Sequence, residues 1–209
     1  MNKDLRNSEL YEECYGEQER RANFRFYTVI LVVAFLLLGF RGYWTNTFGG
    51  VEVDGSSMYR TLSDGERLLM KKVDGDEADY GDVIVVSVGE YPEFSDGTEY
   101  LIKRLIAKAG DRVRCTDGDL EIKYAGAEEW TKIAEPYAYY TSRADYDFVE
   151  YAVGEGEVFF LGDNRNISQD SRYLDGGSRL KGLYKEKDII GIVPKWAIEH
   201  RKTLAKIFF

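Results

Sequence analysis

The stretch from Asp54 to Leu62 (DGSSMYRTL) holds the residue best suited to nucleophilic chemistry, Ser57, directly before Met58. A serine hydroxyl attacks a carbonyl carbon efficiently only when a neighbouring base takes its proton. The usual base is histidine, and the chain holds a single one, His200, which follows the last expected strand in a charged C-terminal tail. We interpret His200 as solvent-facing, so the base must be another residue type.

Lys103 is the remaining candidate for the base. One histidine and one cysteine, Cys115, are expected on the outer side of the membrane segment described below, and they cannot assemble a usual zinc site. Lys103 lies within YLIKRLI and, by strand alternation, shares a face with Leu101 and Leu105. Burial disfavours the ammonium form and lowers the pKa of a lysine, which is the property that a lysine base needs at neutral pH. The alternative is a lysine at a strand edge whose amine reaches solvent.

The residues around these two candidates read as strands and turns. Apolar runs bounded by turn residues predict strands at 50–53, 67–73, 83–88, 100–109, 158–161 and 189–193, and a hairpin at 113–122. The tyrosine-rich stretch 125–153 shows neither the apolar period of a helix nor that of a strand. The many tyrosines and glycines also favour a sheet-rich body over a helical bundle.

An apolar segment precedes this sheet. Residues 26–40 carry no charge and would cover roughly 22 Å as a helix, which Tyr43 and Trp44 at the interface can extend toward a ~30 Å hydrocarbon core. A buried core helix and a cleavable signal peptide are the alternatives. We favour an anchor at 26–44, with 1–25 as a cytoplasmic tail and 45–209 outside, because Arg20, Arg21 and Arg25 precede the span.

Composition excludes some classes of function. The chain has 209 residues, enough for one domain with additions, and 44% of them are hydrophobic. A formal net charge of −9 disfavours nucleic acid as a partner, because phosphate binding needs a basic face. The expected anchor also places Cys14 and Cys115 on opposite sides of the membrane, so they cannot pair.

Four stretches after one expected anchor together resemble the type I signal peptidases (peptidase family S26) of the compact, single-span kind found in Gram-positive bacteria. They occur in the order DGSSMYRTL (54–62), YGDVIV (80–85), YLIKRLI (100–106) and GDNRNISQDSR (162–172). The resemblance runs from the anchor to the last strand. It implies a mainly β fold, with one N-terminal transmembrane helix before a coiled antiparallel β-sheet protease domain and a small lobe near 111–157.

The resemblance also implies roles for individual residues. Ser57 matches the nucleophile, Lys103 the general base, and Ser168 a hydroxyl that orients the lysine amine. The backbone N–H of Ser57 would serve the oxyanion hole, and Met58, Leu62 and Ile102 match the lining of shallow pockets for small substrate side chains. A charged scaffold around the site would comprise Arg104, Asp163, Arg165, Asp170 and Arg172, with Arg104 opposite Asp163.

The activity implied by the resemblance is removal of signal peptides from exported precursors, by cleavage after small-x-small sites at the cell membrane. No cofactor or metal is expected, and membrane lipid and the secretion translocase are expected neighbours.

The chain departs from the family at Arg60, where proline is usual, and at residues 107–111 (AKAGD), where Gly-x-Pro-Gly-Asp is frequent. Ser56 is an adjacent serine, but strand or loop alternation points it away from Ser57.

Two other functions remain as alternatives. A self-cleaving repressor also uses a serine–lysine pair, but it carries a DNA-binding helix-turn-helix where this chain has an acidic tail and an apolar span. A non-catalytic, membrane-anchored β-domain could act as a binding or assembly factor, and Arg60 is the main argument for it.

Overall fold

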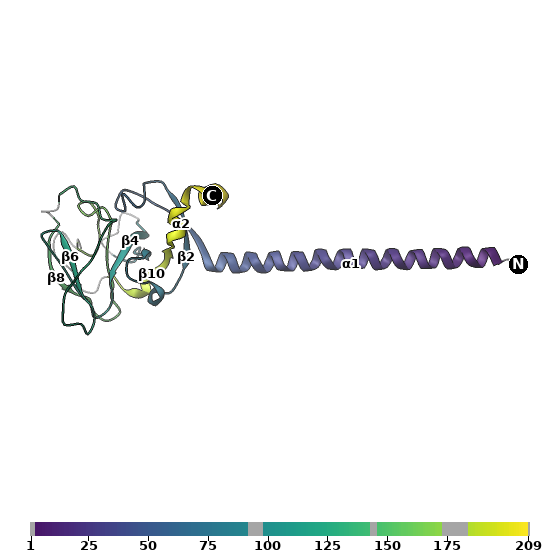
Figure 1. Cartoon of the computed structure of the whole chain (residues 1–209), viewed down its shortest axis with the longest axis horizontal. Coiled ribbons are helices and arrows are strands. Elements are labelled where there is room, and N and C mark those ends of the chain that lie inside the picture. Colours follow the sequence, from purple (N-terminus) through teal and green to yellow (C-terminus); the bar gives the residue numbers. More distant parts are fainter. Residues whose placement is uncertain (1–2, 92–97, 143–145, 173–183, 209) are drawn as a thin grey trace. The chain divides into compact units, whose positions relative to one another are not determined.

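The computed structural model describes residues 3–91, 98–142, 146–172 and 184–208, with side chains from residue 19 onward. The chain divides into two units, residues 1–46 and 47–209. The first unit is one helix, α1 (Lys3–Thr47), which ends where the second unit begins. Each unit is described separately below (Figure 1).

Helix α1 contains a segment, Glu19–Thr47, that is long and apolar enough to cross a membrane, and it is the one such helix in the described chain. None of its most apolar window is buried, and Phe35 and Leu38 are largely exposed. A helix that is apolar all round and unburied does not fit the core of a soluble domain. This exposure argues against the core-helix alternative and fits a membrane anchor or a signal sequence.

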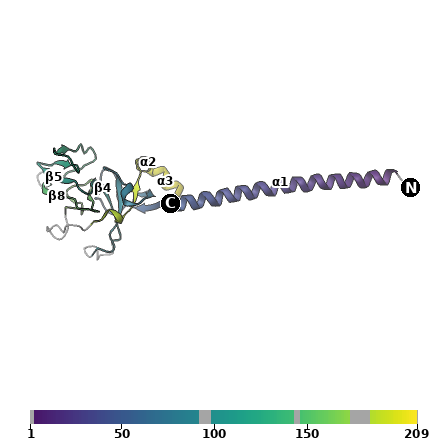
Figure 2. The ribbon, with the colours of Figure 1, turned by 90° about the horizontal axis from the view of Figure 1, so that it is seen from below.

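The second unit contains two antiparallel sheets that lie side by side in both views (Figures 1 and 2). The first has the order β1-β2-β10-β3-β4-β9, with strands β1 (Phe48–Glu52), β2 (Arg67–Lys72), β3 (Val83–Ser87), β4 (Tyr100–Ala107), β9 (Phe159–Leu161) and β10 (Ile189–Val193). The second has the order β7-β6-β5-β8, with strands β5 (Arg112–Thr116), β6 (Asp119–Lys123), β7 (Thr131–Lys132) and β8 (Phe148–Ala152). Short helices complete the unit: the 3-10 helices η1 (Gly75–Glu77) and η3 (Glu186–Asp188), and α2 (Lys195–Glu199) and α3 (Arg201–Phe208).

The mainly β fold with antiparallel sheets after an N-terminal apolar helix is confirmed. Each strand predicted from an apolar run is present within a few residues, and the hairpin turns at Asp117 and Gly118, which both have positive φ. The sequence did not predict β7 and β8, which fall in the tyrosine-rich stretch. Strand β7 is short, and β8 alternates poorly because Phe148 is its only buried residue.

Strand β9 joins the two cores of the unit. Phe160 packs in one hydrophobic cluster with Leu105 and Ile84 of the first sheet. Its neighbours Phe159 and Leu161 point to the other side, into a cluster with residues of the second sheet. Because side chains pack against both faces of β9, the loop that follows it at Gly162 starts from a fixed position.

Candidate active site

Ser57 and Lys103 lie together in the structure. The Nζ atom of Lys103 is 3.0 Å from Ser57 Oγ, and it also donates to the carbonyl oxygen of Ile102 at 3.1 Å. Strand β4 holds the lysine in the sheet, where Lys103 pairs with Ile84 of β3. The separation of 3.0 Å is within the range needed for transfer of the serine proton to a neutral amine.

Lys103 is only 3% exposed. This burial lowers the pKa of its amine to about 8, although Asp170 and Asp163 act in the opposite direction by stabilising the ammonium form. The sequence-based expectation of a buried lysine with a lowered pKa therefore holds. His200, by contrast, is exposed at the end of α2, as expected.

The GDNRN loop (residues 162–166) leaves β9 beside the lysine. Arg104 of β4 pairs with Leu161 of β9 in antiparallel register, so the next residue, Gly162, comes opposite Lys103. The loop also forms two hydrogen bonds with the serine segment. The backbone N–H of Asn164 donates to the Ser57 carbonyl at 2.9 Å, and its side-chain amide donates to the Ser56 carbonyl at 3.1 Å.

Ser168 is buried at 2% exposure next to this loop. Among the described residues its hydroxyl has no hydrogen-bond partner. A methyl group placed on Gly162 would lie 2.1 Å from Ser168 Oγ and 2.6 Å from the Ser57 carbonyl oxygen. Only glycine fits between the two serines, and the three residues are in direct contact.

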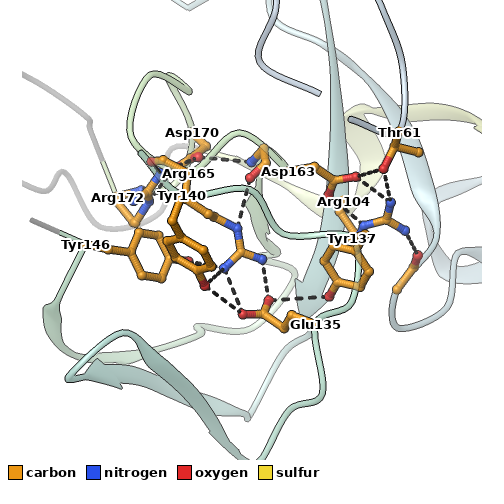
Figure 3. Close-up of polar contacts among 12 residues, drawn as sticks. Thr61, Arg104, Glu135, Tyr137, Tyr140, Tyr146, Asp163, Arg165, Asp170 and Arg172 are labelled. Carbon is orange, nitrogen blue, oxygen red and sulfur yellow. Dashed lines mark hydrogen bonds and ion pairs between the residues drawn. The ribbon is translucent and has the colours of Figure 1, made fainter. Parts of the chain in front are cut away.

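The charged residues predicted to form a scaffold are all buried, and two of the pairs are bidentate (Figure 3). Arg104 donates from Nε and Nη2 to the two oxygens of Asp163 at 2.8 and 2.6 Å. Arg172 donates in the same way to Asp170 at 2.8 and 2.9 Å. The Asp170 carboxylate also accepts from the Gly162 N–H at 3.0 Å. Bidentate geometry fixes orientation as well as distance.

Arg165 pairs with a residue that sequence reasoning missed, Glu135. The guanidinium has no exposed side-chain surface, and Nη1 donates to Glu135 Oε2 at 2.9 Å while Nη2 bonds to Oε1. A signal for this pair was present in the sequence. The two aspartates of the GDNRNISQDSR motif are matched by Arg104 and Arg172, so Arg165 needs a carboxylate from elsewhere if it is buried.

A groove of ≈ 860 Å³ opens at Ser57 and Lys103. Its lining consists of residues 50–58, residues 98–103, Ile167 and Gln169. Met58 and Ile102, two of the predicted pocket residues, belong to this lining, whereas Leu62 is fully buried outside it. The groove lies between two strand edges: β1 is the outermost strand of its sheet, and β9 pairs with β4 only from Arg104 onward.

Arg60 is exposed, and its guanidinium lies 4.7 Å from the ring centre of Tyr139. Tyr59 meets the same ring edge-on at 5.2 Å. The residue that departs from the family pattern therefore packs on an aromatic ring and does not line the groove.

Comparison with known proteins gives a consistent assignment. The family model described as signal peptidase, peptidase S26, matches residues 23–196. Signal peptidase I T of Bacillus subtilis is 36% identical over 149 residues, covering 66% of this chain and 68% of that protein. Signal peptidase I of Streptococcus pneumoniae is 29% identical over 195 residues, covering 78% and 86%. A crystal structure of a signal peptidase I from Enterococcus faecalis aligns with a TM-score of 0.41 and 24% identity over 56% of this chain and 97% of that one. The match to the family model spans the apolar part of α1 and both sheets, and the chain belongs to the signal peptidase family, peptidase S26.

Proposed function

We propose that this signal-peptide-cleaving serine peptidase uses Ser57 as its nucleophile and Lys103 as its general base. The observation that carries the proposal is the 3.0 Å contact between Lys103 Nζ and Ser57 Oγ at a lysine whose burial lowers its pKa to about 8. A neutral amine at this distance can accept the hydroxyl proton. Family membership supplies the reaction, which is hydrolysis of a peptide bond in a precursor protein.

The reaction proceeds by two acyl transfers. Neutral Lys103 takes the proton of Ser57 as Oγ bonds to the carbonyl carbon, and the backbone N–H of Ser57 stabilises the oxyanion. Collapse breaks the C–N bond, and the ammonium of Lys103 gives its proton to the leaving amine. A water molecule then attacks the ester while Lys103 takes one of its protons. That proton returns to Ser57 Oγ when the acid is released.

The groove supports binding of an extended peptide. Residues 50–53 of the β1 region and Tyr100–Lys103 of β4 each present an edge that no other described strand pairs, and both edges line the groove. An extended segment that lies between two such edges can add to the sheet through its backbone. Met58 and Ile102 line the groove beside Ser57 and Lys103, and we propose that they accept the small side chains of small-x-small cleavage sites.

We further propose a single-pass topology in which residues 1–25 are cytoplasmic, 26–44 span the membrane and 45–209 form the extracytoplasmic catalytic domain. Arg20, Arg21 and Arg25 before the span support this orientation. Anchoring in lipid near the secretion translocase would raise the effective concentration of the precursor at the groove. An epitope tag before Lys3 should resist protease added to intact cells, and its digestion there would contradict the topology.

The activity is tested with the full chain in detergent and a peptide that carries Ala-x-Ala before the scissile bond. We expect mass spectrometry to show cleavage at that bond. Ser57→Ala should abolish cleavage, whereas Ser56→Ala, the matched change at the adjacent serine, should leave it measurable. Full activity of Ser57→Ala would refute the nucleophile, and binding of the peptide without any cleavage would favour the non-catalytic alternative.

A further inference from the structure

One segment of the tyrosine-rich stretch contacts the three parts of the chain that carry the candidate active-site residues: the serine segment, strand β4 and the GDNRN loop. This segment, residues 135–140 (EPYAYY), is called the strap here. Its backbone pairs with the GDNRN loop: Tyr139 N–H donates to the Asp163 carbonyl at 2.7 Å, and Arg165 N–H donates to the Tyr139 carbonyl at 2.9 Å. The strap therefore lies along the loop that supports the Ser57 carbonyl (Figure 3).

The aromatic side chains of the strap contact the other two segments of the site. The ring of Tyr137 lies under the Arg104 guanidinium, whose carbon is 3.9 Å from the ring centre, so the strap touches the strand that carries Lys103. The ring of Tyr139 packs against Tyr59 at 5.2 Å, two residues after the nucleophile. Cation–π and edge-to-face contacts of this kind fix relative orientation in addition to excluding water.

Glu135 connects the strap to Arg165 through a buried ion pair. The side chain of Glu135 is 7% exposed and that of Arg165 is 0% exposed. The Glu135 carboxylate also accepts hydrogen bonds from the hydroxyls of Tyr137 at 3.4 Å and Tyr140 at 3.3 Å. Removal of one partner from such a pair leaves an uncompensated buried charge, which the surrounding structure must move to accommodate.

Arg165 connects this ion pair to the proposed catalytic residues through Gly162. Its Nε donates to the carbonyl oxygen of Gly162 at 3.0 Å. Gly162 is the residue packed between Ser168 Oγ and the Ser57 carbonyl. A displacement of Arg165 therefore moves Gly162 and, with it, the two serines.

We propose that the strap is a positioning element for the active site, and that Glu135 is its decisive residue, acting through Arg165 and Gly162 on Ser57. The inference rests on the proposed roles of Ser57 and Lys103. Glu135 touches no reacting atom, so it is a positioning residue and not a catalytic one. Its carboxylate determines where the serine hydroxyl stands relative to the lysine amine.

The substrate groove gives this proposal a specific kinetic consequence. Glu135, Arg165 and Gly162 do not line the groove, whose walls come mainly from residues 50–58 and 98–103, with Ile167 and Gln169 as the other lining residues. Displacement of the GDNRN loop should therefore impair the chemical step more than peptide binding. A misplacement of about 1 Å at reacting groups can cost about a hundredfold in rate.

The first test compares Glu135→Gln with the full-length wild-type chain in detergent, using the Ala-x-Ala peptide. We expect kcat to fall about a hundredfold with KM changed less than about threefold. Glu135→Asp, which keeps the charge on a shorter side chain, should recover part of kcat. The control is Glu121→Gln, which removes a partly exposed partner of Arg114 on β5, at 2.7 Å, and should leave both constants unchanged.

The second test separates positioning from stability. The double variant Glu135→Leu/Arg165→Met removes both charges, so the melting temperature should return toward that of the wild type, because apolar replacement of a buried ion pair is often neutral. Its kcat should remain low, since Gly162 has lost its donor. Recovery of kcat together with the melting temperature would overturn the proposal and leave Glu135 as a charge partner only.

The outcomes distinguish this inference from the proposed function. If Ser57→Ala and Lys103→Met abolish cleavage while Glu135→Gln retains wild-type kcat, only the positioning role fails. If Ser57→Ala or Lys103→Met retains full cleavage, the proposed function itself fails, whatever Glu135→Gln does.

Discussion

Lys103 Nζ stands 3.0 Å from Ser57 Oγ, and Lys103 is only 3% exposed. The contact combines reach with a lowered pKa, because the same burial that holds the amine in place disfavours its charged form. The proposed nucleophile Ser57 thus has, in place of a histidine, a candidate base whose protonation changes near neutral pH.

The pH dependence of cleavage follows from this pKa. Lys103 is protonated and inactive as a base below about pH 8 and neutral above it. We expect kcat/KM to rise with pH by up to about tenfold per unit below pH 8 and to level off above it. The measurement is initial rates of peptide cleavage between pH 6 and 9.5. A rate that is flat or falling across that interval would argue against lysine as the base.

Substitution at Gly162 should disable the site by steric conflict. In Gly162→Ala, the new methyl group would meet Ser168 Oγ and the Ser57 carbonyl oxygen at 2.1 and 2.6 Å, far inside van der Waals contact. We expect kcat to fall by at least about a hundredfold and the melting temperature to drop. Gly89→Ala is the control, because its methyl group would make an ordinary contact of 3.6 Å. Wild-type cleavage by Gly162→Ala would show that the two serines can separate without loss of function.

Arg60 should be dispensable for the chemistry. Its guanidinium packs on Tyr139 and it does not line the groove. Arg60→Ala should cost roughly 0.5–1 kcal/mol of stability through loss of the cation–π contact, with kcat/KM within about threefold of wild type. Denaturant unfolding and peptide cleavage measure the two effects. A loss of activity of tenfold or more would contradict this prediction and make Arg60 a determinant of function.

The sequence predicted the strands of the sheet because strands depend on local patterns, whereas it predicted the Ser57–Lys103 pair through family resemblance. Val83–Ser87 and Tyr100–Ala107 lie between turn residues. Strand alternation made Lys103 a candidate for burial, with a strand-edge lysine as the alternative, and in the structure every residue of β4 from Ile102 to Ala107 is buried. The position of Ser57 beside it could not come from alternation, since the two residues are 46 apart, and was implied by family resemblance.

The strap could not be predicted in the same way. Its tyrosines are half-buried without a period, and its structure is set by backbone bonds to Asp163 and Arg165 and by the ion pair of Glu135, whose partner is 30 residues away. Such loop-to-loop contacts depend on the assembled fold. Once the structure shows that Arg165 is buried and that both aspartates of its motif have other partners, a further carboxylate is required, but the sequence does not indicate which one.

Lys103→Met tests the central claim most directly, with activity and stability measured on the same full-length protein in lipid vesicles. The folded pKa of about 8 lies below the ordinary value of 10.5, so stability is lost as pH falls from 10.5 to 8 and the penalty is fully present at pH 7. Methionine removes it, and we expect stability at pH 7 to rise by up to about 3 kcal/mol. Lys202→Met, at an exposed lysine of α3, should change neither property.

The decisive reading is processing of a signal-peptide-bearing precursor by these vesicles. The serine–lysine mechanism predicts that Lys103→Met leaves the precursor uncut while the protein stays folded and at least as stable as the wild type. Normal processing by the folded Lys103→Met variant would contradict the mechanism.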